Sequence, residues 1–449
     1  MAVRMQRAVS MKGRPRGRLL LAGTAAVAVL ITASVMAAGA MGNTRAAAAQ
    51  KRNPAAHIDY LSIDQNTVWA PLLNAITNKY KKVAPGTTFS DSTIPQQTLN
   101  QKIQLLASQN ALPMLYNTPA NDLLFQLQKK GQVVSVDKEF AKLGVSNDLV
   151  PAAVAILKQI YNGKVLSLPL EFNIEGFWYN KQIFAQNGLT APTTWDQLVA
   201  DAAKLQANGV QPFASSGIQG WPITRLIGNL LFSKLGGNAM SQVIAGKAKL
   251  TDPNYVWAAQ QVANLGSAGY FGKGVASLDY GPAEDVFLQG KAAMFYMGSW
   301  ALSDFNNPKS NLIGLSNLGF FPFPKVAGGK GPAVLIPMNA GQPTSINPKK
   351  LTPANEDWLK YIAQHYGDEA MRQKGQVTGF VVHKFPTNLS PATKLVVKEL
   401  ATAKNPVLWF EALMSAKATT VSQQDAAPLV TGQMSAQSFM SAVQQAISG

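Results

Sequence analysis

Residues 176–189 read GFWYNKQIFAQNGL, and residues 192–198 read PTTWDQL. The aromatic start of the first stretch predicts a strand that ends in its Tyr-Asn-Lys triplet. A short helix then ends at Gly188, because glycine readily takes the left-handed conformation found after a helix C-terminus. After a proline, Thr194 is placed to cap a second helix, which carries Trp195. This block therefore predicts a strand followed by two helices, as in an α/β protein.

Short strand-like runs alternate with amphipathic helices before this block. Residues 57–63 predict a strand, and Thr67 is expected to cap a helix whose apolar residues recur at helical spacing as far as Tyr80. A buried strand over 113–116 opens onto the polar Asn117. This repetition predicts a mostly parallel sheet with helices on both faces, and a ligand site at the carboxyl ends of its strands.

The pattern after residue 150 is less regular. Residues 161–164 read YNGK and predict a turn between two strand-like runs. Residues 200–302 predict mainly helices, interrupted by a glycine-rich loop over 264–281. The dense prolines and glycines of 318–343 predict an extended crossing between two lobes, and the chain from 353 onward is again mainly helical.

Composition limits the classes of protein that the chain can represent. Its 449 residues are enough for two domains, and 47% hydrophobic with 14% charged residues is typical of a folded globular protein. The absence of cysteine excludes disulfides, thiolate metal ligands, cysteine nucleophiles and a lipoprotein anchor. The three histidines lack metal-ligand spacing, so we expect neither a metal nor another cofactor.

The formal net charge of +17 raises the alternative of a nucleic-acid partner. However, no basic run contains interleaved aromatic residues, and the basic residues beyond the N-terminus are scattered. The sequence favours a solvated basic surface, and we expect no nucleic-acid partner.

The first 49 residues have the order of an export signal. A basic segment ends at Arg18, and an uncharged apolar stretch covers residues 19–40. Small residues favour cleavage after Ala40 or after Ala49. An uncleaved membrane anchor is the alternative, because about 20 apolar residues can span a bilayer. In either case the rest of the chain is expected to be exported, to a periplasm or to the extracellular face of the cytoplasmic membrane.

Several short pieces of sequence occur in a fixed order. YNGK (161–164) precedes the block at 176–198, FLQGKAAM (287–294) and GSW (298–300) follow it, and TGF (378–380) ends the series. Together these pieces resemble the extracellular solute-binding proteins of carbohydrate ABC importers, similar to maltose- and other sugar-binding proteins. The resemblance implies a two-lobe periplasmic-binding-protein fold (type II-like), with a hinge between lobes that are each a mostly parallel sheet flanked by helices.

The resemblance also implies domain boundaries and partners. The export signal would cover 1–49, the first lobe 50–170 and again 325–375, the second lobe 171–324, and C-terminal helices, mainly of the second lobe, 376–449. A monomer would close its lobes around a mono- or oligosaccharide and then dock on the permease subunits of an ABC importer in the membrane.

A sugar site needs an aromatic platform for C–H faces and planar side chains that bind hydroxyl groups. The resemblance assigns the platform to Trp300 of the GSW piece, with Trp221 and Trp409 as further candidates. Core packing is the alternative for each of these three residues. Trp69 is assigned to the core. Polar candidates follow strand-like runs or lie at the expected lobe crossing, although Asp279 is equally placed to cap a helix. The predicted ligand-binding residues are Gln65, Asn66, Asn117, Glu171, Asn173, Trp221, Asp279, Trp300, Asn339 and Trp409.

Glu171 and Glu175 raise the alternative of a secreted glycan-acting hydrolase, because glycosidases use two carboxylates roughly 5–10 Å apart. On one strand these positions would lie about 13 Å apart, and the chain has no serine-hydrolase motif. We therefore assign no catalytic residue and do not expect an enzyme. The same fold binding amino acids or polyamines is a further alternative, and a cleft rich in acids would support polyamines.

Overall fold

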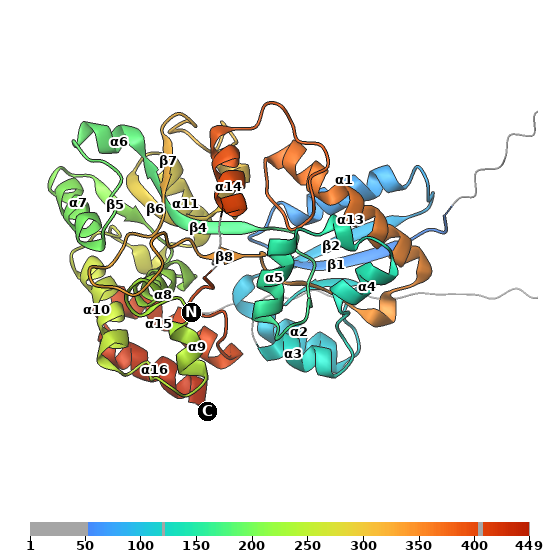
Figure 1. Cartoon of the computed structure of the whole chain (residues 1–449), viewed down its shortest axis with the longest axis horizontal. Helices are drawn as coiled ribbons and strands as arrows, with labels where there is room; N and C mark the ends of the chain where they lie inside the picture. The colour runs from blue at the N-terminus through green and yellow to red at the C-terminus, as the bar shows by residue number, and fades with distance from the viewer. Residues whose placement is uncertain (1–52, 119–121, 403–406, 449) are drawn as a thin grey trace, which may run out of the picture. The chain divides into compact units, whose positions relative to one another are not determined.

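The computed structural model describes residues 53–118, 122–402 and 407–448. The predicted export signal over 1–49 lies outside these residues. Within them the chain forms two β-sheets accompanied by helices, and Figure 1 shows strands β1 and β2 in blue, apart from the green strands β4 and β5 of the other sheet. This arrangement confirms the predicted two-lobe α/β architecture.

The first sheet has the strand order β2-β1-β3-β9. Strand β1 (His57–Ile63) pairs in parallel with β2 (Thr88–Ile94) and β3 (Leu115–Asn117), whereas β9 (Thr344–Ile346) is antiparallel to β3. The parallel β-α repeat expected near the start of the chain is therefore confirmed. The carboxyl ends of β1 and β3 lie at the same edge of the sheet, where a ligand site is expected.

Helix α1 (Trp69–Tyr80) follows β1, but its cap differs from the prediction. Asn66, not Thr67, caps the helix: its Oδ1 accepts hydrogen bonds from the backbone N–H groups of Val68 and Trp69, each at 2.9 Å. These N–H groups have no partner within the helix, and a short amide side chain just before the first turn can reach both. The capping bonds hold Asn66 at the carboxyl end of β1.

Five further helices surround the first sheet or precede the second: α2 (Leu99–Ser108), α3 (Asp122–Lys129), α4 (Val136–Lys142), α5 (Pro151–Ile160) and α13 (Pro353–Lys374). Because α5 ends directly before residues 161–164, the predicted turn follows a helix and not a strand-like run. The turn itself is present, with left-handed backbone at Asn162 and Gly163.

The second sheet has the order β5-β6-β4-β7, and β8 extends the pairing of β4. Its strands are β4 (Asn173–Asn180), β5 (Gln211–Ala214), β6 (Ala292–Gly298), β7 (Leu318–Phe321) and β8 (Met338–Asn339). Of these described pairs, β5 and β6 are parallel, whereas β6, β7 and β8 are all antiparallel to β4. The expectation of a mostly parallel sheet is therefore wrong for this lobe, because the alternation of strands and helices does not fix the direction in which each strand returns.

The block that opens the sequence argument folds as predicted. Strand β4 ends at Asn180, helix α6 (Lys181–Gln186) follows, and Gly188 has a positive φ of 60°. Helix α7 (Trp195–Ala207) is capped by Thr194, whose hydroxyl accepts from the backbone N–H of Gln197 in a capping box.

The remaining helices are α8 (Trp221–Leu235), α9 (Ala239–Ile244), α10 (Pro253–Ser267), α11 (Tyr280–Leu288), α12 (Leu302–Phe305), α14 (Pro391–Thr402), α15 (Ala416–Val430) and α16 (Ala436–Ser448). Short 3₁₀ turns cover η1 (Gln96–Thr98), η2 (Ser146–Asp148), η3 (Val275–Ser277), η4 (Ser299–Ala301) and η5 (Pro348–Lys350). The loop predicted over 264–281 is shorter than expected, because α10 continues into it and η3 occupies its centre. Helices α15 and α16, red in Figure 1, pack against α8 and α10.

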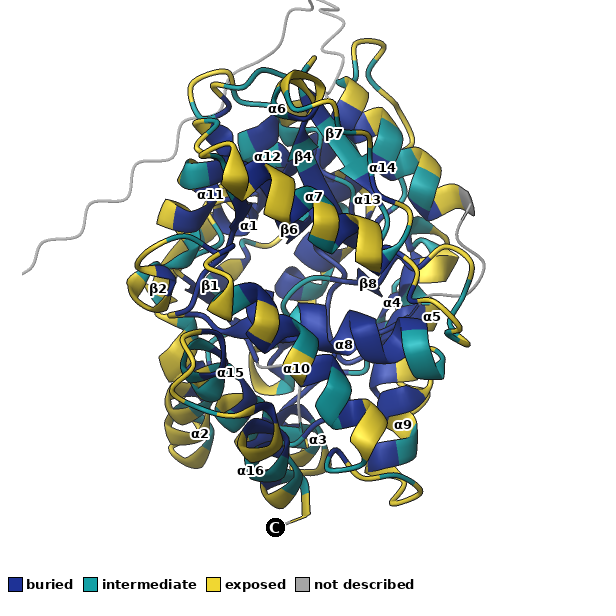
Figure 2. Ribbon diagram, turned by 90° about the vertical axis from the view of Figure 1, so that its left-hand side faces the viewer, coloured by how far each residue is buried: buried dark blue, intermediate teal, exposed yellow. Residues whose placement is uncertain are grey.

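Two hydrophobic clusters hold the fold together. One contains the strands of the first sheet with Trp358, and the other contains Trp195, Phe213 and much of α8. Figure 2 shows β4 and β6 coloured as buried, whereas α2 and α16 alternate buried and exposed turns. The central strands therefore lie in the core, and the outer helices cover them with one apolar face. In the described part of the chain, no helix is both long and apolar enough to cross a membrane.

The two sheets are joined by paired chain segments. Leu168 bridges to Thr344 of β9, and a few residues later Asn173 and Ile174 pair with Asn339 and Met338 of β8. The start of β4 and strand β8 thus run side by side where the chain passes between the sheets. We call residues 168–174 and 338–344 the hinge segments, because they connect the two sheets.

Candidate ligand-binding cleft

A cavity of about 270 Å³ lies where residues from both lobes meet. The ends of β1 and of the hinge segments contribute to its lining, as do the N-termini of α8 and α11, the loop after residue 407 and one face of α15. Its lining consists of Ile63, Gln65, Asn66, Trp69, Gln96, Gln97, Leu99, Asn100, Glu171, Ile218, Trp221, Arg225, Tyr280, Trp300, Asn339, Gly341, Gln342, Trp409, Glu411, Thr419, Thr420, Gln423 and Gln424.

Aromatic rings form one side of the cleft. Trp221 and Trp300 lie edge to face, with ring centroids 5.6 Å apart and planes 67° apart. Tyr280 lies on the other side of Trp221, at 6.1 Å and 30°. Trp300, Tyr280 and Trp409 are partly exposed, whereas Trp221 is 7% exposed. The exposed rings offer apolar faces, and Trp221 holds two of them in place.

Gly298 gives Trp300 the space that it occupies. Residue 298 ends β6, and the chain then turns through η4 so that the Trp300 indole folds back over it. A Cβ atom at position 298 would lie 1.9 Å from Cζ3 of Trp300. Only glycine at this position permits the observed ring placement.

Arg225 lies between two of the tryptophans. Its guanidinium carbon is 5.4 Å from the ring centroid of Trp221 and 5.3 Å from that of Trp409. Such contacts are attractive because the ring faces carry partial negative charge. Trp221 and Arg225 are four residues apart on α8 and therefore share one face of the helix.

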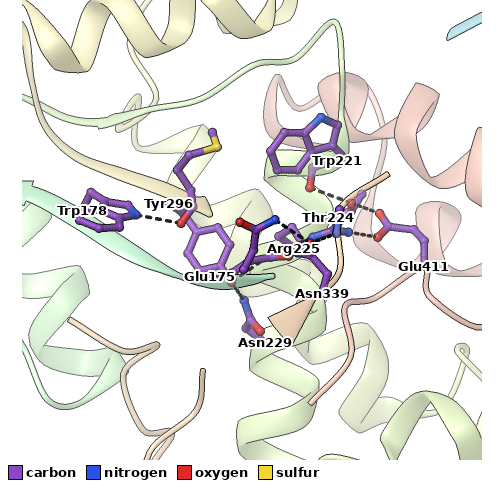
Figure 3. Close-up of polar contacts among 12 residues, drawn as sticks. Glu175, Trp178, Trp221, Thr224, Arg225, Asn229, Tyr296, Asn339 and Glu411 are labelled. Carbon is purple, nitrogen blue, oxygen red and sulfur yellow. Dashed lines mark hydrogen bonds and ion pairs between the residues drawn. The ribbon is translucent and has the colours of Figure 1, made fainter. Parts of the chain in front are cut away.

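Two buried carboxylates neutralise Arg225. Its Nε donates to Glu175 at 3.0 Å, and its Nη1 donates to Glu411, which also accepts from the Thr224 hydroxyl (Figure 3). Burial raises the pKa of Glu411, and the neighbouring Arg225 charge opposes that rise. Since Glu175 is fully buried and Arg225 mostly so, these charges are committed to one another, and not offered to a ligand.

Glu171 connects the hinge to the end of β1. Its Oε1 accepts from Asn66 Nδ2 at 3.2 Å and from Trp69 Nε1 at 3.0 Å. Its Oε2 accepts from Asn173 Nδ2 at 2.9 Å. Burial raises the pKa of Glu171 to about 7, although the three hydrogen bonds act in the opposite direction. The carboxyl group therefore titrates near neutrality at the wall of the cleft.

An amide chain continues from Glu171 through the hinge. Asn173 Nδ2 also donates to Asn339 Oδ1 at 3.1 Å, and Asn339 Nδ2 donates to Glu175 Oε1 at 2.9 Å. Ser299 Oγ donates to Asn173 Oδ1 at 3.0 Å. Glu171 and Glu175 are thus joined by two asparagines that belong to the two paired hinge segments.

The structure brings seven of the ten predicted site residues into the lining of the cleft: Gln65, Asn66, Glu171, Trp221, Trp300, Asn339 and Trp409. Asn173 lies directly behind the lining in the amide chain. Asn117 is fully buried, and its side chain bonds to the backbone of Ile63 and to Thr344, so it fixes the first sheet and does not line the cleft. Asp279 accepts from the backbone of Tyr280 and from Gln219, as a helix cap, and lines a neighbouring cavity.

Several lining residues were not predicted. Arg225 has a sequence signal, namely its spacing of four from Trp221 within a predicted helix. Trp69 was assigned to the core and is indeed buried, but its indole N–H binds Glu171 at the wall of the cleft. No sequence signal identifies the amide side chains of η1 and α15, because their place depends on how distant helices pack.

The chain has two sheets, paired hinge segments that connect them, and a cleft between the two lobes. These features define a two-lobe class of binding protein. The model of the family described as bacterial extracellular solute-binding protein matches residues 64–363. The chain belongs to this family.

Two curated relatives match part of the chain. It is 30% identical to the multiple sugar-binding protein of Streptococcus mutans over 213 residues, and this alignment covers 45% of this chain and 48% of that protein. It is 26% identical over 223 residues to an uncharacterised ABC transporter extracellular-binding protein of Pyrococcus horikoshii, covering 47% and 49%. The chain thus matches about half the length of these relatives.

Solved structures match more of the chain. A chitin oligosaccharide binding protein superposes with a TM-score of 0.77 at 24% identity, over 88% of this chain and all of that one. At this identity the similarity establishes the fold alone.

Proposed function

We infer that the protein is the binding component of an ABC importer and captures a mono- or oligosaccharide in the cleft. The observation that carries this proposal is the pairing of partly exposed aromatic rings with a lining rich in amides. Nine of the lining residues are Asn or Gln, and they share the cleft with Trp300, Tyr280 and Trp409. Amide groups both donate and accept, and so match sugar hydroxyl groups, while the rings match C–H faces.

The charges in the cleft support a neutral ligand better than an amino acid. An amino-acid carboxylate would need a free cation, but Arg225 is already held by Glu175 and Glu411. Breaking that pair would leave buried carboxylates uncompensated, which typically costs about 3–5 kcal/mol. The names of the related sugar-binding proteins agree with a saccharide ligand.

Delivery of the ligand would follow from closure of the lobes about the paired hinge segments. Ligand contacts with both lobes stabilise a closed form, which a membrane permease could then distinguish from the empty protein. We propose that the protein acts as an exported monomer without catalysis or cofactor, with two lobes that meet at the hinge segments 168–174 and 338–344.

A thermal-shift and calorimetric screen tests the proposal. The purified protein is titrated with mono-, di- and oligosaccharides, amino acids and polyamines. A ligand that binds only the folded protein adds about 2.7 kcal/mol of stability at 100 times its Kd. Saturable binding of one sugar class, with the sugar recovered intact, supports the proposal. Binding of amino acids alone, or hydrolysis of a bound oligosaccharide, would overturn it.

A further inference from the structure

A second cavity of about 310 Å³ adjoins the cleft. Gln65, Asn66, Tyr280 and Trp300 line both spaces, so a ligand group placed against Trp300 has access to either. The second cavity lies between the end of β1, the first turns of α11 and the short helix α12.

The lining of this side cavity is strongly acidic. It contains Asp279, Glu284, Asp285 and Asp304, and it contains neither lysine nor arginine. None of these four carboxylates forms an ion pair with a described residue, although the chain as a whole has a formal net charge of +17. An acidic concavity on a basic protein attracts cations and concentrates the field within it.

Glu284 is the member of the group that lacks a partner. Its side chain is buried, with 7% of the residue exposed, and its Oε1 has no hydrogen-bond partner. Burial, followed by the charges of Asp304 and Asp285, raises its pKa well above the ordinary range. A buried carboxyl group without a partner is costly, and folded proteins usually satisfy such groups.

A cationic ligand group would satisfy it. An ammonium group offers three N–H donors and a positive charge, which matches several carboxylates that surround one space. A metal ion fits less well, because the described residues contain no cluster of three or more ligands arranged to hold one.

We propose that the side cavity is a subsite for the ammonium group of an amino sugar whose ring packs against Trp300. This inference rests on the proposed saccharide function and narrows it to saccharides with a free amine. Asp304 supplies the charge, Glu284 offers the buried oxygen that lacks a hydrogen-bond partner, and the aromatic residues shared with the cleft hold the sugar ring to which the amine belongs.

Matched saccharides test the inference. Calorimetric titration compares a cello-oligosaccharide, the glucosamine oligomer of equal length and its N-acetylated form, and repeats the comparison with glucose and galactose against their 2-amino forms. Within each series only the group on carbon 2 changes, between hydroxyl, ammonium and, for the oligomers, acetamido. We expect the amine to bind at least about tenfold more tightly than its neutral partner, and to lose this advantage as salt is added.

Variants locate the effect. Glu284→Gln and Asp304→Asn should each remove most of the amine preference, measured as the ratio of the Kd of the neutral sugar to that of the amino sugar. Asp91→Asn, an exposed acid on β2 outside both cavities, makes the same change in net charge and should have no effect.

Equal affinity for amino and neutral sugars would overturn the subsite and leave the proposed function standing. An amine preference that survives both substitutions would also overturn it. If no saccharide binds, amino or neutral, the proposed function fails and the subsite fails with it.

Discussion

Asn173 and Asn339 face each other across the antiparallel pair of β4 and β8, and the amide of Asn173 donates to the carbonyl of Asn339 at 3.1 Å. Each asparagine also binds a buried carboxylate, Glu171 in one case and Glu175 in the other. One of these carboxylates contacts the first lobe through Asn66, and the other contacts α8 through Arg225. The hinge therefore carries a continuous polar connection between the two walls of the cleft.

Breaking this connection should cost stability. Asn339→Ala removes the donor that Glu175 Oε1 binds and one of the two acceptors of Asn173 Nδ2, and both of these residues are buried. Because unsatisfied buried polar groups each cost about 1–3 kcal/mol, we expect urea denaturation to show a loss in that range or above. Asn264→Ala, at an exposed position on α10, serves as the control and should change the free energy of unfolding by less than about 0.5 kcal/mol. Equal effects of the two substitutions would contradict the structural role of the hinge amides.

Trp300→Ala should weaken sugar binding with little effect on folding. The ring is partly exposed and offers a face to the cleft, so its loss should cost about 2 kcal/mol of binding free energy, roughly a thirtyfold rise in Kd. Trp300→Phe keeps a smaller aromatic face and should lose less. Trp257→Ala removes a partly exposed tryptophan that contacts Lys234 on the far side of α8, and should leave the Kd unchanged. A Trp300→Ala protein with wild-type affinity would exclude this ring as the platform.

Arg225 should contribute mainly to the stability of the fold, and should affect sugar affinity only through the neighbouring Trp221 and Trp409. Arg225→Gln leaves Glu175 and Glu411 without a counter-charge, which we expect to cost about 3–5 kcal/mol. Adding Glu411→Gln removes one of the stranded charges and should restore part of that loss, which a double-mutant cycle measures directly. Arg225→Lys keeps the charge, but lysine lacks the planar guanidinium that binds both carboxylates. This variant should therefore fold, but bind sugar more weakly than the wild type. Additive losses in the cycle would show that the three side chains do not act together.

The titration of Glu171 should make stability depend on pH in a defined window. Its pKa is about 7 in the folded protein and 4.5 ordinarily, so between these values the folded state holds a proton that the unfolded state releases. The free energy of unfolding should therefore fall as pH rises from 4.5 to 7, by up to about 3 kcal/mol from this group. Below 4.5 both states are protonated, and above 7 the full penalty applies.

Glu171→Gln isolates this contribution. Relative to the wild type, the variant should gain stability steadily as pH rises through the window, whereas Asn264→Ala, which changes no titratable group, should give a curve parallel to that of the wild type. Denaturation at pH 4.5, 6 and 8 measures the differences. Parallel curves for the wild type and Glu171→Gln would show that folding does not raise the pKa of Glu171.

The parts of the fold that could be predicted depend on local chemistry. Gly188 and Thr194 mark helix ends by backbone conformation and capping, which neighbouring residues decide, and strand β1 follows from its largely alternating apolar and polar residues. The direction of the strands beside β4 could not be predicted, because antiparallel pairing with β6 and β7 depends on how the whole lobe returns on itself.

The candidate site shows the same division. Trp300 was predicted from the resemblance of its Gly-Ser-Trp piece to the sugar-binding family, and Asn66 because it follows a strand. Asn117 was predicted to follow a strand in the same way, but it is the last residue of β3 and points back into the sheet, where Tyr60 and Thr344 bind it. Placement after a strand identifies the correct edge of the sheet, but packing by distant residues decides which side chains reach the cleft.

The space above Gly298 should decide whether Trp300 can serve as a platform. Gly298→Ala introduces a Cβ atom 1.9 Å from the Trp300 ring, so the indole must move while the backbone of β6, which is extended here, remains permitted. We expect a loss of sugar affinity that approaches that of Trp300→Ala, and a change in the tryptophan fluorescence that accompanies ligand binding. In a Trp300→Ala background the same alanine has no ring to displace, so the double variant should bind no more weakly than Trp300→Ala alone. Additive losses of binding free energy would show instead that Gly298 acts on the ligand or on the hinge directly, and not through the position of Trp300.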